Sequence, residues 1–224
     1  MFYGAAKAAV KVRLGLYDEM TTLAAKYKSD KGVTIFPFHG YSVHYEMLFE
    51  RLRDRAINML EIGLARRTDR RSLGIGCPSL SMWLDYFPKA NVFGFDIDDF
   101  SWVDLPRTQI VRGDQGNSDD LRKLVAKCPR FDIIIDDGSH ASYDQQVTLK
   151  TLFPHLASSG LYVIEDLRWQ PDDLEASLPP TRKTRDLLKD RSALDELISD
   201  VKEVRFFASG TRKTSDGLGV IVKR

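Results

Sequence analysis

The sequence lacks a hydrophobic run that could cross a bilayer, since such a span needs about 20 consecutive apolar residues. It also lacks the hydrophobic segment and cleavage pattern of a secretory signal near its start. An excess of one charge is missing too: the net charge is +1 over 224 residues, so no global field favours nucleic acid or an acidic membrane. These absences predict a cytoplasmic protein whose partners include neither nucleic acid nor membrane.

Cysteine is scarce, and the two residues present, Cys77 and Cys128, have no disulfide or metal-binding spacing. This usage fits a reducing compartment. Internal repeats and a second domain are also missing from the pattern, while 43% hydrophobic and 29% charged residues are typical of a globular protein. We therefore expect residues 1–224 to form a single domain, with 1–55 as an N-terminal helical extension.

What the sequence does contain is a regular alternation of strands and helices. Apolar, β-branched segments predict strands at 58–63, 92–96, 109–112, 131–136 and 161–166. Helical spacing predicts helices around 45–52, 80–87 (capped by Ser79), 121–125, 149–156 (ended by 158–160) and 194–201. The polar stretch 168–186 predicts a loop, and 203–208 with 218–223 predict a hairpin. This order predicts an α/β fold: a seven-stranded, mostly parallel sheet with helices on both faces and an antiparallel strand at one edge.

The segment 131–140 carries the clearest functional pattern. Three consecutive isoleucines form a strand buried on both faces, and Asp136 and Asp137 end it. Gly138 allows a sharp turn, and His140 follows. Ligands of open α/β sheets bind beyond the carboxyl ends of the strands. One acid would be enough to cap the next helix, so two acids and a histidine favour a functional site.

Three other strand ends are also polar, and together they suit an adenosine-containing cofactor. Asp96 can accept hydrogen bonds from both ribose hydroxyls, and Asp114 with Gln115 can contact the adenine edge. The first strand ends in Glu61-Ile-Gly63, where glycine lets the backbone approach a ligand. No G-x-G-x-x-G follows this strand, which argues against a dinucleotide. The pattern is compatible with S-adenosylmethionine, which has no phosphate.

A second group of residues combines Asp137 and His140 with Glu165 and Asp166, which end the fifth predicted strand. Three carboxylates are hard oxygen ligands and suit Mg²⁺, Mn²⁺ or Ca²⁺. His140 is placed for a general base, and its alternative role is to order the turn. Neighbouring strands would bring these groups together, so the pattern favours a metal site with an adjacent base.

These segments resemble the metal-dependent sugar O-methyltransferases of macrolide and related antibiotic pathways, of the mycinamicin and tylosin type. The matching segments are Ser29–Gly32, His39–Tyr41, Leu60–Gly63, Ser81–Pro88, Gly94–Ile97, Gly113–Gln115, Ile135–His140 and Gly160–Leu167. The resemblance implies a class I methyltransferase fold, with S-adenosylmethionine as donor and Mg²⁺ as activator. It also implies an acceptor hydroxyl on a small molecule, a sugar of a glycosylated natural product.

The resemblance also assigns roles to individual residues. It implies metal ligands at Asp137, Glu165 and Asp166, and catalysis by His140 as base with Asp137. It implies cofactor binding by Glu61, Gly63, Asp96, Asp114, Gln115 and Asp136. Three alternatives stay open: a catechol-type methyltransferase, a cephalosporin-hydroxylase-like protein that needs iron and oxygen, and a cofactor-binding protein without chemistry. A homo-oligomer is compatible with the sequence.

Overall fold

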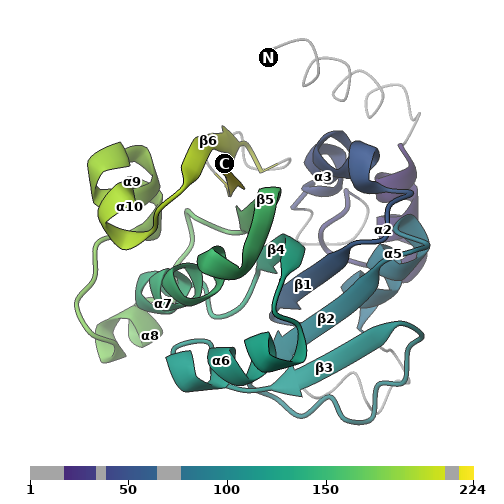
Figure 1. Ribbon diagram of the computed structural model, residues 1–224, viewed down its shortest axis with the longest axis horizontal. Helices are drawn as coiled ribbons and strands as arrows, with labels where there is room; N and C mark the ends of the chain where they lie inside the picture. The colour runs from purple at the N-terminus through teal and green to yellow at the C-terminus, as the bar shows by residue number, and fades with distance from the viewer. Residues whose placement is uncertain (1–17, 34–38, 65–76, 210–216) are drawn as a thin grey trace.

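The computed structural model describes residues 18–33, 39–64, 77–209 and 217–224. Seven strands form a sheet in the order β3-β2-β1-β4-β5-β7-β6 (Figure 1). The strands are β1 Asn58–Ile62, β2 Asn91–Asp96, β3 Thr108–Arg112, β4 Phe131–Asp136, β5 Leu156–Ile164, β6 Val201–Phe207 and β7 Leu218–Lys223. The helices are α2 Glu19–Tyr27, α3 Ser42–Phe49, α5 Pro78–Tyr86, α6 Ser118–Lys127, α7 Ser142–Leu152, α8 Asp172–Ser177, α9 Thr184–Lys189 and α10 Arg191–Leu197, with short 3₁₀ turns at Glu50–Leu52 and Phe153–His155.

The predicted sheet is confirmed, with one change at its C-terminal end. Strands β1 to β5 pair in parallel, whereas β7 is antiparallel to both β5 and β6. The antiparallel strand was expected at the edge, but β7 lies one strand in and β6 forms the edge. Composition explains this order. Five of the six residues of β7 are buried, whereas β6 carries Lys202, Glu203 and Arg205, and charged side chains protect an edge strand from further pairing.

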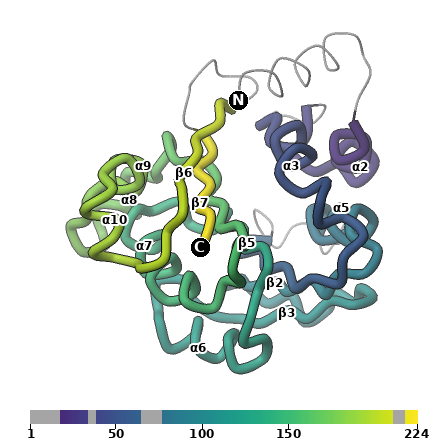
Figure 2. The backbone as a smooth tube through the Cα atoms, turned by 45° about the horizontal axis from the view of Figure 1, so that its top comes forward, coloured from purple at the N-terminus to yellow at the C-terminus, as the bar shows by residue number. Residues whose placement is uncertain are grey.

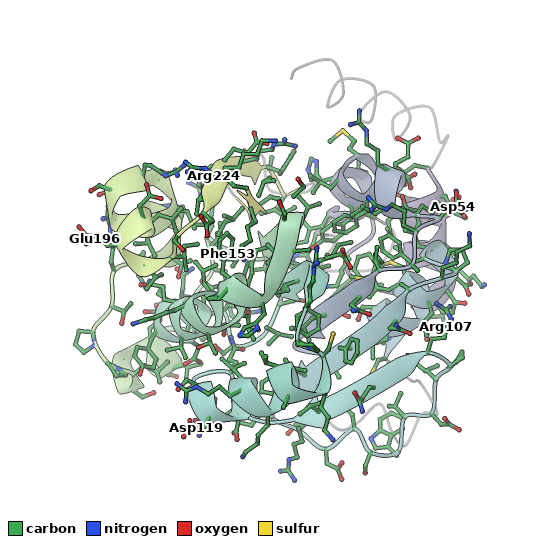
Figure 3. The ribbon with its side chains drawn as sticks, in the orientation of Figure 1. Asp54, Arg107, Asp119, Phe153, Glu196 and Arg224 are labelled. Atoms are coloured by element: carbon green, nitrogen blue, oxygen red, sulfur yellow. The ribbon has the colours of Figure 1, made fainter. Side chains whose placement is uncertain are left out.

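Successive side chains along the central strands point to opposite faces and build two hydrophobic cores. Ile133 and Ile135 pack with α2, α3 and α5 on one face, and Ile134 packs with α6, α7, α9 and α10 on the other. Figures 1 and 2 both show these two helix groups on different sides of the sheet. In Figure 3 the charged side chains of Asp119 and Glu196 stand at the periphery, whereas Phe153 is buried. A continuous isoleucine run is therefore needed because both faces of β4 are covered.

Three local predictions differ from the structure. Helix α5 begins at Pro78, with Cys77 and not Ser79 as the capping residue, because proline is pre-organised for the first helical position. The last helix ends at Leu197, and Val201 already belongs to β6. Ser158 to Gly160 lie within β5, where the pairing with β4 shifts register, and α7 has already ended at Leu152.

The predicted loop 168–186 contains α8 and the start of α9. Helix α8 has no buried residue, so a hydrophobic pattern could not reveal it. Its first turn is acidic, which complements the positive end of the helix dipole. Glu175 accepts a hydrogen bond from the backbone N–H of Ser142 at 2.8 Å, which joins α8 to the start of α7.

Several predictions fall partly outside the described residues. These include residues 1–17 of the expected N-terminal helical extension and the turn of the predicted hairpin at 210–216. Within the described part of the chain, no helix has the length and apolar character to cross a membrane. Helices α2 and α3 supply the described part of the expected N-terminal helical layer.

Candidate active site

A cavity of about 610 Å³ lies at the carboxyl ends of β1, β2, β4 and β5. Strands β2 and β3 extend the sheet on one side of β1, and β4 and the later strands extend it on the other side. The order of the strands therefore reverses at β1. The crevice at such a switch point is where open α/β sheets bind ligands. Gly63, Asp96, Asp137 and Glu165, from four different strand ends, all line this cavity.

Glycine is required at the end of β1 by the close approach of two backbones. Gly63 has φ +81°, and a Cβ atom there would lie 2.1 Å from the carbonyl oxygen of Asp137. The backbone N–H of Asp137 in turn donates to the carbonyl of Ile62 at 2.9 Å. The floor of the cavity is therefore bare backbone between β1 and β4, which leaves room for a ligand.

The six predicted cofactor residues divide into two groups. Gly63, Asp96, Asp114 and Gln115 line the cavity. Glu61 and Asp136 are buried behind the lining, at 0% and 1% exposure. Glu61 accepts a hydrogen bond from the indole N–H of Trp83 at 3.0 Å. In this structure, Glu61 and Asp136 support the residues around the cavity, and the other four are in a position to touch a ligand.

Asp96 is held by the backbone and faces the cavity. Its two oxygens accept hydrogen bonds from the N–H groups of Leu64, at 2.7 Å, and Asp98, at 2.8 Å. Burial raises the pKa of this carboxyl, although the two N–H donors partly offset the effect. Each carboxylate oxygen has a second lone pair, so Asp96 can still accept hydrogen bonds from two ligand hydroxyls.

Gln115 joins the turns after β3 and β4. Its amide oxygen accepts from the backbone N–H of Ser139 at 2.7 Å, and its amide nitrogen donates to Asp136 at 3.3 Å. A Cβ atom on Gly138 would lie 1.7 Å from that amide oxygen, so the glycine makes this contact possible. Because both ends of the amide are engaged, Gln115 fixes the turn that carries Asp137 and His140.

Three predicted site residues converge in the cavity, on the turns that follow β4 and β5. Nε2 of His140 lies 4.0 Å from Oδ1 of Asp137 and 3.9 Å from Oδ2 of Asp166. One ligand atom from each of the three residues lies within 4.8 Å of the others. Two carboxylates and an imidazole within this distance could hold a divalent cation.

The third predicted metal ligand, Glu165, faces a different partner. Its Oε1 lies 2.7 Å from the ammonium group of Lys31 and also accepts a hydrogen bond from the hydroxyl of Tyr45. Burial and the nearby Asp137 raise the pKa of Glu165, while Lys31 opposes that shift. Glu165 still lines the cavity, so it lies next to the converging group without being part of it.

Asp166 is oriented by two residues from the N-terminal helical layer. Its Oδ1 accepts a hydrogen bond from the hydroxyl of Tyr41 at 2.7 Å and lies 3.3 Å from Nδ1 of His39. Burial alone would raise the pKa of Asp166, but the hydrogen bond and charge of His39, with His140 nearby, lower it well below the usual range. The lowered pKa favours the ionised form of Asp166, which is the form in which a carboxyl group binds a metal.

The turn that carries His140 is in an unusual conformation. His140 has φ +61° and Asp166 has φ +51°, in the left-handed region that L-residues rarely occupy. Such backbone strain concentrates at functional sites. The ring of Trp169 meets the His140 ring edge-on at 5.2 Å, and Trp169, Leu174 and Leu178 form an apolar border to the same cavity. This side can contact an apolar part of a ligand.

Lys31, His39, Tyr41 and Tyr45 were not predicted as site residues. The signal available was the segment 36–44, whose aromatics and two histidines are unusual in a connector. The segment 29–32 is polar in sequence, and no pattern in it indicated that its lysine is buried beneath acids. Lys31 and Tyr41 reach the site only through contacts with residues more than 100 positions away in the sequence.

The sheet order with its reversed seventh strand, and the cavity at the switch point, define the class I methyltransferase fold. Solved structures agree. MycE, a methyltransferase from the mycinamycin biosynthetic pathway solved with Mg and S-adenosylhomocysteine (SAH), matches with a TM-score of 0.74 and 28% identity over 92% of this chain and 55% of that chain. A second structure of MycE also contains mycinamycin VI.

Relatives among characterised proteins lead to the same group. An 8-demethyl-8-alpha-L-rhamnosyl tetracenomycin-C 2'-O-methyltransferase from Streptomyces olivaceus is 41% identical over 146 residues, 65% of this chain and 37% of its own length. The mycinamicin VI 2''-O-methyltransferase of Micromonospora griseorubida is 35% identical over 150 residues, 66% of this chain and 36% of its own. No family model matches the chain.

These matches confirm the resemblance to antibiotic O-methyltransferases that the sequence predicted. The chain spans little more than a third of the length of the characterised relatives. The fold and the resemblance to these methyltransferases are therefore shown.

Proposed function

We propose that the protein transfers a methyl group from S-adenosylmethionine to a hydroxyl of a glycosylated natural product, with help from Mg²⁺. The observation that carries this proposal is the convergence of His140, Asp137 and Asp166 beside a cavity whose other half is lined by Gly63 and Asp96. The matches to rhamnosyl tetracenomycin and mycinamicin O-methyltransferases support the acceptor class.

The residues present fit the cofactor. Asp96 offers free lone pairs for the ribose hydroxyls, and the bare backbone at Gly63 allows close approach. S-adenosylmethionine supplies a methyl group that is already electrophilic, so the chain mainly has to align the acceptor with it. No phosphate-binding loop is needed for this ligand.

The residues also fit a divalent cation, since Asp137, Asp166 and the adjacent Glu165 supply hard oxygen donors. A cation held there would lower the pKa of a nearby acceptor hydroxyl. His140 has its Nε2 atom directed to the same point and accepts the proton. With S-adenosylmethionine held at Gly63 and Asp96, the acceptor oxygen would bond to the methyl carbon as the carbon–sulfur bond breaks, which would leave SAH.

A transfer assay tests this function. The protein is incubated with methyl-labelled S-adenosylmethionine and a panel of rhamnosylated and macrolide glycosides, with Mg²⁺ or with EDTA. We expect label in at least one glycoside with Mg²⁺, none in EDTA, and recovery when excess Mg²⁺ is added. Transfer at the full rate in EDTA, with metal analysis confirming removal, would contradict the role of the cation. Binding of SAH without transfer to any glycoside of the panel, or to a catechol added as a further acceptor, would instead favour a cofactor-binding protein without chemistry.

A further inference from the structure

Lys31 is a charged side chain that the proposed mechanism does not use. It is 2% exposed, and lysine is almost never buried unless its ammonium group is paired. Here the ammonium nitrogen lies 2.5 Å from Oδ2 of Asp137, 2.7 Å from Oε1 of Glu165 and 3.3 Å from Oε1 of Glu61. Three acids from the ends of β1, β4 and β5 thus share one cation that belongs to the protein.

The backbone around Lys31 is fixed by the N-terminal helices, so the ammonium group has a defined position. The carbonyl of Lys31 accepts from the N–H of Ser42, the first residue of α3, at 2.8 Å. The N–H of Ser29 donates to the carbonyl of Ala24 in α2 at 2.9 Å. A Cβ on Gly32 would lie 2.9 Å from that of Ala24, so the turn packs tightly on α2.

The contacts of Lys31 separate the two oxygens of Asp137. Oδ2 faces Lys31, whereas Oδ1 faces Nε2 of His140 at 4.0 Å. Lys31 likewise occupies Oε1 of Glu165, which also accepts from Tyr45. Each of these two acids therefore has one oxygen held by Lys31, and both side chains also line the cavity.

We propose that Lys31 is a positioning residue that orients Asp137 and Glu165 for binding a divalent cation. This inference rests on the cation site of the proposed function. Residues that hydrogen-bond to metal ligands typically change metal affinity by about 10–100-fold when they are replaced. Charge alone would act in the opposite direction, because removing an ammonium group beside a divalent cation removes a repulsion. The sign of the change in affinity therefore separates orientation from charge.

The test is a titration with Mn²⁺, whose free form gives an electron paramagnetic resonance signal that disappears on binding, followed by competition with Mg²⁺. Lys31→Met keeps the length of the side chain but loses its donor and its charge. Lys26→Met is the matched control: it also removes one ammonium from the N-terminal layer, but Lys26 is 57% exposed and pairs with the exposed Asp85 at 2.6 Å. We expect Lys31→Met to bind Mn²⁺ roughly 10–100-fold more weakly and Lys26→Met to bind like the wild type.

Unchanged or tighter Mn²⁺ binding by Lys31→Met would overturn the inference. If the wild type itself does not bind Mn²⁺, the cation site of the proposed function is absent and the inference about Lys31 is wrong as well. Failure of the proposed function is thus seen in the wild type, whereas failure of the inference alone is seen in Lys31→Met.

A crystal structure of the wild type with Mn²⁺ gives a second test that needs no variant. We expect the ammonium still on Asp137 Oδ2 and Glu165 Oε1, with the ion on the Oδ1 side of Asp137. An ion at the ammonium position, or a displaced Lys31, would overturn the proposal.

Discussion

At the scale of single residues, His140 is the side chain on which the proposed proton transfer depends. Its ring lies between two carboxylates and the edge of Trp169, and its backbone is held in the left-handed region by the turn after β4. A residue that only ordered this turn would not need an imidazole directed at Asp137 and Asp166. The geometry supports the interpretation of His140 as a base over that of a turn residue.

Replacing His140 with alanine should therefore affect turnover more than binding. We expect His140→Ala to lower the turnover number by roughly 10²–10⁴-fold, the usual contribution of a positioned base. Affinity for SAH, measured by calorimetry, should be retained because Asp96 and Gly63 are unchanged.

The control is His155→Ala, which removes a histidine whose ring contacts only the carbonyl of Pro129 among the contacts described. That variant should turn over like the wild type. If His140→Ala also keeps the wild-type rate with saturating acceptor, the proton must leave by another group, and His140 is structural.

Asp96 leads to a prediction about pH. Its pKa is raised by burial, and ribose hydroxyls donate stronger hydrogen bonds to its ionised form than to its protonated form. As the pH falls through this raised pKa, Asp96 takes up a proton and the affinity for SAH should fall. The loss should begin at a higher pH than for an ordinary aspartate, whose pKa is about 3.9. Calorimetric titration with SAH between neutral and mildly acidic pH measures this dependence.

Asp96→Asn separates this carboxyl from other titrating groups. Charge-assisted hydrogen bonds contribute about 1.5–3 kcal/mol each, so at neutral pH the variant should bind SAH at least about tenfold more weakly. Its remaining affinity should also depend less on pH. Asp119→Asn, at a side chain 75% exposed on α6, is the control and should match the wild type. Equal affinity of Asp96→Asn and wild type would remove Asp96 from the cofactor site.

The residues that sequence analysis missed share a physical cause. Asp137 and Asp166 could be predicted because acids at the ends of adjacent parallel strands must meet at one edge. Lys31 could not, because its partners Asp137 and Glu165 are 106 and 134 positions away and come from other elements. No local periodicity shows which turn will fold over a cluster of acids. A lysine in a polar segment is normally expected to be exposed to solvent.

At the scale of elements, the strands were the most predictable part. Buried parallel strands are continuous apolar runs, and each predicted strand from the first to the fourth overlaps the observed one to within a residue or so. The fifth strand begins earlier than predicted, at Leu156, since Ser158 and Ser159 look like a turn in sequence but are exposed positions of β5. Exposed strand positions carry no hydrophobic signal.

Helix α8 illustrates the opposite case. None of its six residues is fully buried, so the sequence has no hydrophobic periodicity there, and Glu175 joins the helix to the start of α7. Leu174 of α8 and Leu178 directly after it line the cavity near Trp169. The segment predicted as a polar loop therefore forms the apolar border of the site, and its function depends on how it packs and not on its local propensity.

At the scale of the whole molecule, the cavity is assembled from most of the chain. Its lining runs from Ser29 in the N-terminal layer, through the ends of β1, β2 and β4, to Leu178. The hydrogen bonds of Tyr41 and Tyr45 to Asp166 and Glu165 attach the N-terminal helices to the sheet at this site. A ligand that fills the cavity would touch both the N-terminal layer and the strand ends. Its binding should therefore be coupled to folding.

This coupling predicts that SAH stabilises the whole chain against heat. A ligand at about 100 times its dissociation constant adds roughly 2.7 kcal/mol to the free energy of unfolding. For a domain of this size, each kcal/mol raises the melting temperature by about 2–4 °C, so the shift should be roughly 5–10 °C. Scanning calorimetry with increasing SAH measures the shift in melting temperature, which should grow with ligand concentration.

NAD at the same concentrations is the matched control, since it contains adenosine but also a pyrophosphate, for which the sequence after β1 has no glycine-rich loop. An equal shift with NAD would mean that the cavity recognises adenosine alone, and the assignment of Gly63 and Asp96 to S-adenosylmethionine would have to be withdrawn.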